Sequence, residues 1–427
     1  MKTLVNCAIA FTIVQCMGSL AVLDRTLYGE WEGKGGDKLT QLLNVLSIAA
    51  ALFLMLRSRV TLARLRTINI LPLLYVGLGL VSAAWSTDMG ASVRTGINNA
   101  CVAVAALGMV YSVPVDRIMK ITVLVAVMAG LASLALAFTP YGYLSTAIGH
   151  TDFRGAFSYK NALAEAMTGG VLAALYCFMA ERKGRLKYGV AIVFCIAMTV
   201  AAKSSTSLLV GLVYIAMLTV MTLYSRRGAA RILCYCLIGC MLIALTVIAI
   251  APDILFEALG KDATLTGRTE IWPYVIPEIL KKPLLGWGLN GFWLLSNPDA
   301  VEIDRALVWT VPEAHNGLLE LLLQLGLVGT ILVLVIMYRS FRQAKLCIRY
   351  ADPYLGRTTI AFLVGLLVMA ISEAILLAPG QITTLQFFLC AWMCDASLAV
   401  ARQKRSIYSA ANPALASLYR QRHYRTG

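Results

Sequence analysis

Long apolar runs separated by short polar segments fill most of this chain. Most runs reach about 18–22 residues, enough to cross the hydrocarbon core of a membrane as a helix. Backbone N–H and C=O groups find no water there, so each spanning segment must satisfy them internally. The pattern predicts an all-α polytopic membrane protein with about 12 transmembrane helices, at residues 3–23, 39–56, 68–85, 95–112, 121–139, 160–180, 188–202, 206–224, 232–251, 316–338, 358–378 and 382–400.

Composition and charge support this fold class and orient the chain. The sequence is 59% hydrophobic and 14% charged, whereas soluble domains are about 45–50% apolar and about 25% charged. The net charge of +15 does not indicate nucleic acid, because the basic residues concentrate in short loops between spans. With both termini inside, 25 Lys and Arg residues lie on the inner side and 12 on the outer side. The positive-inside rule therefore turns residues 252–315 outward, to the periplasm in a bacterium.

One membrane domain with four stretches follows from this topology. Residues 1–251 hold nine transmembrane helices, 252–315 a large periplasmic loop, 316–400 three more helices, and 401–427 a basic cytoplasmic tail. Apolar residues recur in the loop at near-helical spacing, which predicts a short amphipathic helix. They are Ile271, Trp272, Val275, Ile276, Ile279 and Leu280. Several aromatic residues nearby favour a position at the lipid–water interface.

Five cations lie on the outer side, where the positive-inside rule disfavours them: Arg94, Arg154, Lys160, Lys203 and Arg268. The fork of donors on an arginine matches phosphate oxygens two at a time, so several such groups can bind a diphosphate. The alternative is that each cation snorkels to the lipid headgroups, which we favour for Arg94 and Lys203. Arg154 and Arg268 stand in glycine-containing turns, FRGAF and TGRTE, and there we favour a functional role.

His315, in the sequence EAHNGLLELL, precedes a predicted span. A neutral imidazole at that position can accept a proton from a hydroxyl nucleophile, and a helix amino end favours anions. Alternatively, His315 and Asn316 only cap the helix. Glu373 falls late in its span, where it can orient His315 or a cation, or pair structurally with a basic residue. Glu320 lies five residues after His315, near it but not squarely on the same helix face.

Several signals of other chemistries do not occur in the sequence. It has no Asp-x-Asp pair of the kind that binds metal-diphosphate, no Walker loop, no HExxH and no GxSxG. The eleven cysteines avoid the loops predicted to lie outside, so we expect no disulfide framework. These observations favour a site built on basic residues, without metal and without cofactor.

Six segments in a fixed order on one predicted face of the membrane resemble the O-antigen ligase and polysaccharide polymerase family. They are SAAWSTDMGASVR (82–94), RGAFSYKN (154–161), AAKSSTS (201–207), TGRTEIW (266–272), KKPLLGWGLNGF (281–292) and AHNGLLELLLQLGLVG (314–329). Many ligases of this family have His-Pro or His-Lys where this chain has Tyr159-Lys160 before Asn161. That departure is closer to the exopolysaccharide polymerase branch, so the acceptor stays open.

The resemblance implies a fold like that of the GT-C glycosyltransferases and a metal-independent transfer in the periplasmic leaflet of the inner membrane. A glycan would pass from an undecaprenyl diphosphate carrier to a hydroxyl of another glycan or of lipid A core. Arg154 and Arg268 would bind the diphosphate and His315 would activate the hydroxyl, with Lys160, Arg94, Lys203, Asn316 and Glu373 as further substrate-binding residues. Membrane lipid, a chain-length regulator and other polysaccharide-assembly proteins are the remaining expected partners; nucleic acid is not one.

Two other classes of function compete with the enzyme. A transporter or flippase of lipid-linked saccharides would place charges and broken helices near the bilayer midplane, whereas the cations here gather at one surface. A structural scaffold would have no need of outward cations in glycine-containing turns. Both are weaker hypotheses than glycan transfer.

Overall fold

The computed structural model describes residues 2–20, 38–57, 68–145, 151–224, 228, 268–374 and 381–411. Helices dominate these ranges, and one two-stranded antiparallel ribbon accompanies them. The first half contains α1 (Lys2–Met17), α3 (Lys38–Arg57), α5 (Leu71–Val81), η1 (Ser82–Trp85), α6 (Met89–Ser112), α7 (Val115–Leu136), η2 (Pro140–Gly142), β1 (Tyr143–Ser145), β2 (Thr151–Phe153), α8 (Lys160–Ala180), α9 (Arg185–Ala201) and α10 (Ser205–Tyr224). The second half contains α13 (Arg268–Lys281), α14 (Pro298–Leu307), α15 (Gly317–Tyr350), α16 (Pro353–Ala370) and α17 (Ile382–Ala411).

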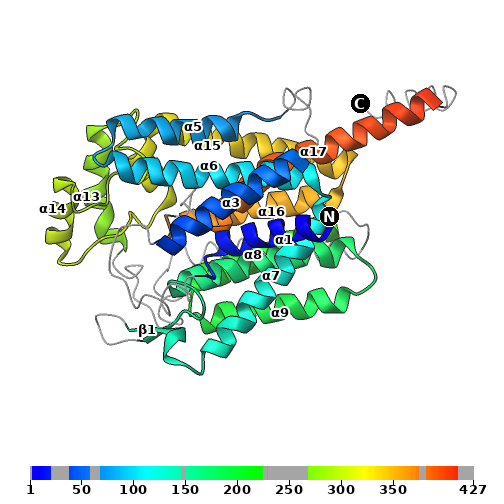
Figure 1. Ribbon diagram of the computed structural model, residues 1–427, viewed down its shortest axis with the longest axis horizontal. Helices are drawn as coiled ribbons and strands as arrows, with labels where there is room; N and C mark the ends of the chain where they lie inside the picture. The colour runs from blue at the N-terminus through cyan, green and yellow to red at the C-terminus, as the bar shows by residue number, and fades with distance from the viewer. Residues whose placement is uncertain are drawn as a thin grey trace.

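The predicted fold class, an all-α polytopic membrane protein, is confirmed. Seven helices in the described ranges are long and apolar enough to cross a membrane: α6, α7, α8, α10, α15, α16 and α17. Shorter apolar helices occupy three further predicted spans, at Lys2–Met17, Val45–Leu56 and Leu71–Trp85. The predicted span 232–251 lies outside the described residues. The helices run roughly along one common direction as a bundle (Figure 1).

Two helices extend well beyond the predicted ends of their spans. α15 was predicted to end at residue 338 but continues to Tyr350, and α17 continues past residue 400 to Ala411. These extensions carry arginine and lysine residues, which are good helix formers but too polar for hydrocarbon. Hydropathy therefore predicts where a span leaves the membrane and not where its helix ends.

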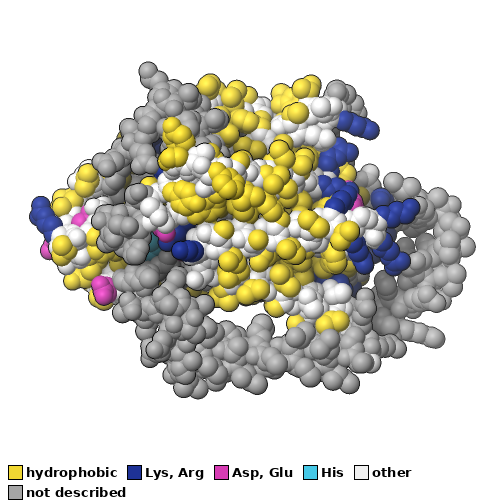
Figure 2. Space-filling view, turned by 90° about the horizontal axis from the view of Figure 1, so that it is seen from below, with side chains coloured by type: hydrophobic (Ala, Val, Ile, Leu, Met, Phe, Trp, Pro, Cys, Tyr) yellow, Lys and Arg dark blue, Asp and Glu magenta, His cyan; other side chains and the backbone are white. Residues whose placement is uncertain are grey.

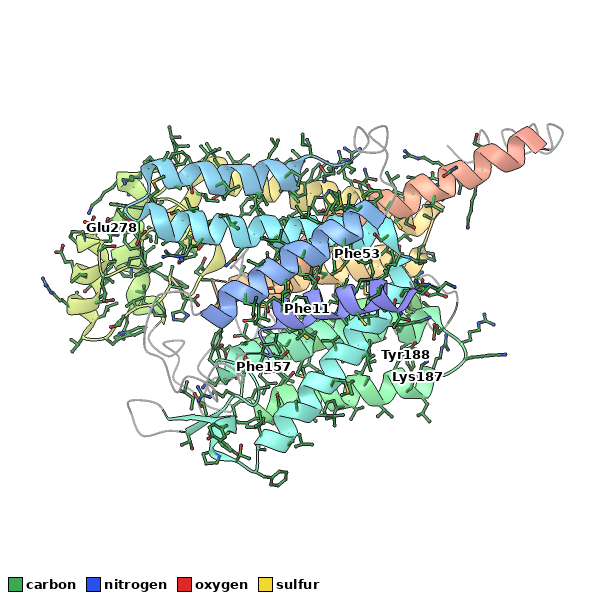
Figure 3. All side chains as sticks on the ribbon, in the orientation of Figure 1. Phe11, Phe53, Phe157, Lys187, Tyr188 and Glu278 are labelled. Carbon is green, nitrogen blue, oxygen red and sulfur yellow. The ribbon has the colours of Figure 1, made fainter. Side chains whose placement is uncertain are left out.

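α13 and α14 form a small subdomain at one end of the bundle (Figure 1). Its own apolar core includes the α13 stripe Ile271, Val275 and Ile279, together with Trp287, Phe292 and Trp293. The four-residue spacing of the stripe places it on one helix face, as the sequence predicted, whereas Ile276 and Leu280 are exposed. Figure 3 labels Glu278 in this α13–α14 subdomain, away from Lys187 and Tyr188 at the opposite end of the bundle.

A break in α15 attaches the subdomain to the bundle. At Gly326 the backbone leaves the helical region (φ 61°, ψ −162°). The groups freed by the break bond to the segment 283–288: Leu327 N–H donates to Pro283 O (2.9 Å), Val328 N–H to Leu284 O (3.1 Å), and Trp287 N–H to Leu323 O (2.9 Å). Interrupted helices are tolerated at membrane depth only when protein satisfies the backbone in this way. The segment KKPLLGWG therefore docks into the gap in LGLVG.

Gly286 has no room for a side chain at this junction. Its φ is +66°, and an added Cβ would lie 2.5 Å from the carbonyl carbon of Gln324. Both the left-handed backbone and the overlap disfavour alanine, so we expect Gly286→Ala to destabilise the fold by on the order of 3 kcal/mol. The measurement is the thermal unfolding midpoint in detergent. Gly77→Ala in α5 is the control, because its Cβ would meet nothing within 4 Å; equal midpoints for the two variants would contradict this explanation.

The two ends of the bundle differ in charge. Lys and Arg side chains gather at the end opposite the α13–α14 subdomain, and an apolar belt lies between the two ends (Figure 2). The sequence predicts that the large loop and the dense basic loops lie on opposite sides of the membrane. The separation of the α13–α14 subdomain from the basic end of the bundle agrees with that prediction (Figure 2).

A candidate site at the amino end of α15

The turn before α15 holds His315 in a strained backbone conformation. Its φ is +47°, in the left-handed region that costs a residue other than glycine about 1–3 kcal/mol. Asn316 follows as the N-cap: its side-chain oxygen accepts from the N–H groups of Leu318 (3.0 Å) and Leu319 (3.1 Å). The capping role that the sequence left open thus belongs to Asn316, and His315 is free of it. Strain of this kind persists where the surroundings impose it, often at functional sites.

Carboxylates surround His315. Its Nδ1 atom lies 3.1 Å from Oε1 of Glu313, although the two groups are not aligned as a hydrogen bond and Nδ1 is buried without a hydrogen-bond partner among the described residues. A carboxylate oxygen of Glu373 also lies within 4.8 Å of the ligand atoms of these two residues. The carboxylates of Glu313 and Glu373 also act electrostatically on the nearby Tyr159, together with that of Glu165.

Three loops from distant parts of the sequence meet at the segment 371–373, after α16. The amide of Asn316 donates to Ile371 O (3.3 Å). Thr206, at the start of α10, shares a hydrogen bond with Ser372 (2.9 Å between the two hydroxyl oxygens). Asn161, at the start of α8, donates to Oε1 of Glu373 (3.2 Å). The sequence segments AHNG, AAKSSTS and RGAFSYKN therefore meet at one end of the bundle.

Arg154 is held in a tight turn seven residues before Asn161. The N–H groups of Arg154 (2.9 Å) and Gly155 (3.0 Å) both donate to Gly142 O, and Phe157 N–H donates to Arg154 O (3.1 Å). Gly155 has φ +55°, and an added Cβ would lie 2.3 Å from Cβ of Ser133, so the turn requires glycine. The arginine is 5% exposed and its Nη1 donates to Ser158 O (3.5 Å). The tight glycine turn expected from FRGAF is present.

The other predicted cations differ in how they are placed. Lys160 begins α8 and forms an ion pair with Asp152 of β2 (2.9 Å). Lys203 is exposed in the turn between α9 and α10, with φ +54°, three residues before Thr206. Arg94 is exposed in the second turn of α6, and no described contact joins it to the turn of His315. These positions suit Lys160 and Lys203 better than Arg94 for a part in the site.

Arg268 is the first residue of α13, and its side chain lies outside the described residues. α13 itself is connected to the turn before α15, because Nε1 of Trp272 donates to Ala314 O (3.1 Å). Trp272 lies one helical turn after Arg268 in α13. The hydrogen bond from Trp272 to Ala314 therefore connects the start of α13 to the turn of His315. The role of Arg268 remains a prediction.

Glu313, His315 and Glu373 are the described residues whose spacing could hold a cation. Two carboxylates and an imidazole suit a transition metal such as manganese or zinc. Sequence reasoning missed Glu313, although its place two residues before His315 was a usable signal. It also missed Asn161 and Thr206, whose partners lie about 160 residues or more away in the chain and which no local pattern identifies.

Taken together, a membrane-spanning helical bundle carries a polar site at the amino end of α15, and the segment that follows α13 docks at the break in the same helix. Residues 190–334 match the O-antigen ligase domain family, a range that includes Lys203, Arg268, His315 and Asn316. The chain is 25% identical to the exopolysaccharide production protein ExoQ of Rhizobium meliloti over 344 residues, 76% of each chain. Shorter matches are to putative polysaccharide ligases of Rickettsia conorii, 32% identical over 25% of this chain and 26% of the relative, and Rickettsia felis, 28% identical over 21% and 23%.

These comparisons confirm the predicted resemblance: residues 190–334 match the O-antigen ligase family, and the chain is similar to an exopolysaccharide production protein and to putative polysaccharide ligases. The structure and the comparisons therefore define a multi-pass membrane protein that is similar in sequence to O-antigen ligases.

Proposed function

We propose that this protein transfers a glycan from an undecaprenyl diphosphate carrier to an acceptor hydroxyl at the periplasmic face of the bacterial inner membrane. The observation that carries the proposal is the convergence of three loops on residues 371–373, which brings His315, Asn161 and Thr206 to one end of the bundle. The family match supports transfer of a glycan, and the apolar belt of the bundle supports a lipid-linked donor.

In the proposed reaction the acceptor oxygen attacks the anomeric carbon of the donor sugar. The new C–O bond forms as the bond from that carbon to the diphosphate oxygen breaks, and the lipid diphosphate leaves with the bonding electrons. His315 takes the hydroxyl proton, because a neutral imidazole is a competent base near neutral pH. The neighbouring carboxylate of Glu313 stabilises the imidazolium that results.

The departing diphosphate concentrates negative charge, and cations placed at its position lower the barrier more than they stabilise the bound donor. Arg154 and Arg268 are assigned this role, with Lys160 and Lys203 as weaker contributors and Arg94 farther away. The tight turn that holds Arg154 supports the assignment, since a preorganised group needs no rearrangement during the reaction. Glu373 and Asn316 hold the site together and contribute to substrate binding.

The acceptor is either another lipid-linked glycan, as in a polymerase, or lipid A core, as in a ligase. The lysine before Asn161 and the extent of the match to ExoQ favour the polymerase. A chain-length regulator and other assembly proteins are the partners this reaction would require in the cell. A flippase is the weaker alternative: α15 is broken, as transporter helices often are, but the freed backbone groups bond to the segment 283–288 rather than to a passing substrate.

The test is transfer in vitro from a defined undecaprenyl-diphosphate oligosaccharide by the purified full-length protein in detergent or lipid vesicles. We expect product to form in EDTA at the same rate as in Mg²⁺ or Mn²⁺, because cationic side chains neutralise the diphosphate. If EDTA abolishes activity and Mn²⁺ or Zn²⁺ restores it, metal-free catalysis is wrong; if no glycan moves under any condition, the proposed function fails.

A further inference from the structure

Glu320 is a buried carboxylate that the proposed reaction does not use. It lies near the start of α15 and is 6% exposed. Its Oε2 accepts from Ala314 N–H (2.7 Å), its Oε1 accepts from Nε2 of Gln324 (2.6 Å), and Nε1 of Trp293 lies 3.1 Å from both oxygens. Burying a carboxylate is costly unless donors surround it, so its presence calls for a specific reason.

The peptide groups around Ala314 supply that reason. Its N–H is bound by Glu320 from α15, and its C=O accepts from Nε1 of Trp272 on α13 (3.1 Å). The residue itself is fully buried. His315 comes next in the chain and adopts a left-handed backbone, followed by Asn316, which is bound to α15 and to Ile371. The imidazole therefore stands between two residues that hydrogen bonds fix in place.

We propose that Glu320 and Trp272 are positioning residues that hold His315 in its catalytic orientation through the backbone of Ala314. The inference rests on the proposed function, in which His315 is the base. The hydrogen bond from Trp272 to Ala314 also connects the α13–α14 subdomain to His315. Trp272 lies one turn after Arg268 in α13, so this bond joins the helix of a proposed diphosphate-binding residue to the turn that carries the proposed base. A misplacement of about 1 Å in such a group can lower a rate about 100-fold.

Two tryptophan substitutions separate this role from general stability. Trp272→Phe removes the hydrogen bond to Ala314 and keeps an aromatic ring. Trp287→Phe is the matched control, because its Nε1 donates to Glu278 O (2.9 Å) in the same small core and not to the turn of His315. We expect Trp272→Phe to lower kcat about 10-fold, with unchanged affinity for the lipid-diphosphate donor, and Trp287→Phe to keep kcat within about 2-fold.

Glu320→Gln tests the second contact. The control is Glu278→Gln, at a similarly buried carboxylate whose Oε1 lies 2.8 Å from Nζ of Lys281. We expect a loss of about 100-fold in kcat for Glu320→Gln and little change for Glu278→Gln. The assay is glycan transfer, read as kcat and donor affinity and paired with the unfolding midpoint of every variant. If Glu320→Gln does not fold, Trp272→Phe still decides the question.

If these residues had only a structural role, the loss of kcat would follow the fall in the unfolding midpoint in both members of each pair. That result would overturn the proposal. Wild-type kcat in folded Trp272→Phe and Glu320→Gln would overturn it as well. His315→Ala in the same assay distinguishes the two levels of inference. If His315→Ala keeps full activity, the proposed base is wrong; if it is inactive while the positioning variants are normal, only the positioning role fails.

Discussion

His315→Ala is expected to lower the rate of glycan transfer by about 10²–10⁴-fold, the range that general acid–base catalysis typically contributes. The acceptor hydroxyl would then have no base at the amino end of α15, and the neighbouring carboxylate of Glu313 would have no imidazolium to stabilise. The fold should survive, because Asn316 and not His315 caps the helix. The measurement is kcat for transfer from the lipid-diphosphate donor.

His150→Ala is the matched control, since we assign no role to that histidine, which lies outside the described residues. It should retain the wild-type rate. Binding of the donor to His315→Ala should also be unchanged, because the base acts on the acceptor. An active His315→Ala protein, with the wild-type rate, would remove the base from the scheme.

Replacement of either arginine assigned to the diphosphate should lower the rate of glycan transfer by a similar factor to His315→Ala. Removing one preorganised group that stabilises charge in the transition state commonly costs about 10²–10³ in rate, and we expect this for Arg154→Ala and for Arg268→Ala. Arg154→Lys should recover only part of the loss, because an ammonium cannot offer the paired donors of a guanidinium. The measurement is kcat and donor affinity with the lipid-diphosphate oligosaccharide.

Arg305→Ala provides the comparison for these variants. Arg305 is exposed on α14, in the same subdomain, so its removal changes the net charge equally without touching the site. Similar losses for Arg305→Ala and Arg268→Ala would mean that overall charge attracts the donor and that no specific diphosphate contact exists. A loss confined to the two assigned arginines is the expected outcome.

The membrane spans were predictable because hydrocarbon imposes a length and a composition on each of them. The stripe of Ile271, Val275 and Ile279 was readable for a similar reason, since a helix that buries one face repeats every three or four residues. Hydropathy does not predict the end of a helix outside the membrane, where its side chains no longer face lipid. α15 and α17 therefore run past their predicted ends. The break at Gly326 could not be predicted from the sequence, because the backbone segment that bonds to it, 283–288, lies about 40 residues earlier in the chain.

Parts of the candidate site were predictable to different degrees. His315, Asn316 and the turn of Arg154 stood out because a rare polar group or a required glycine marks them locally. Glu313 was overlooked although it lies two residues before His315. The roles of Glu320 and Trp272 depend on hydrogen bonds to one backbone amide and one carbonyl. The sequence led us to expect cations around the imidazole, whereas the described contacts of His315 are with carboxylates. Contacts made across the fold leave no periodic trace in a single sequence.

The arrangement of donor, cations and base can be measured directly by cryo-electron microscopy of the protein with a bound undecaprenyl-diphosphate oligosaccharide. We expect the diphosphate between the side chains of Arg154 and Arg268, with the first sugar beside His315 and room for an acceptor hydroxyl within about 3 Å of the imidazole. A diphosphate bound at the end of the bundle where α17 terminates, or one that touches neither arginine, would contradict this arrangement.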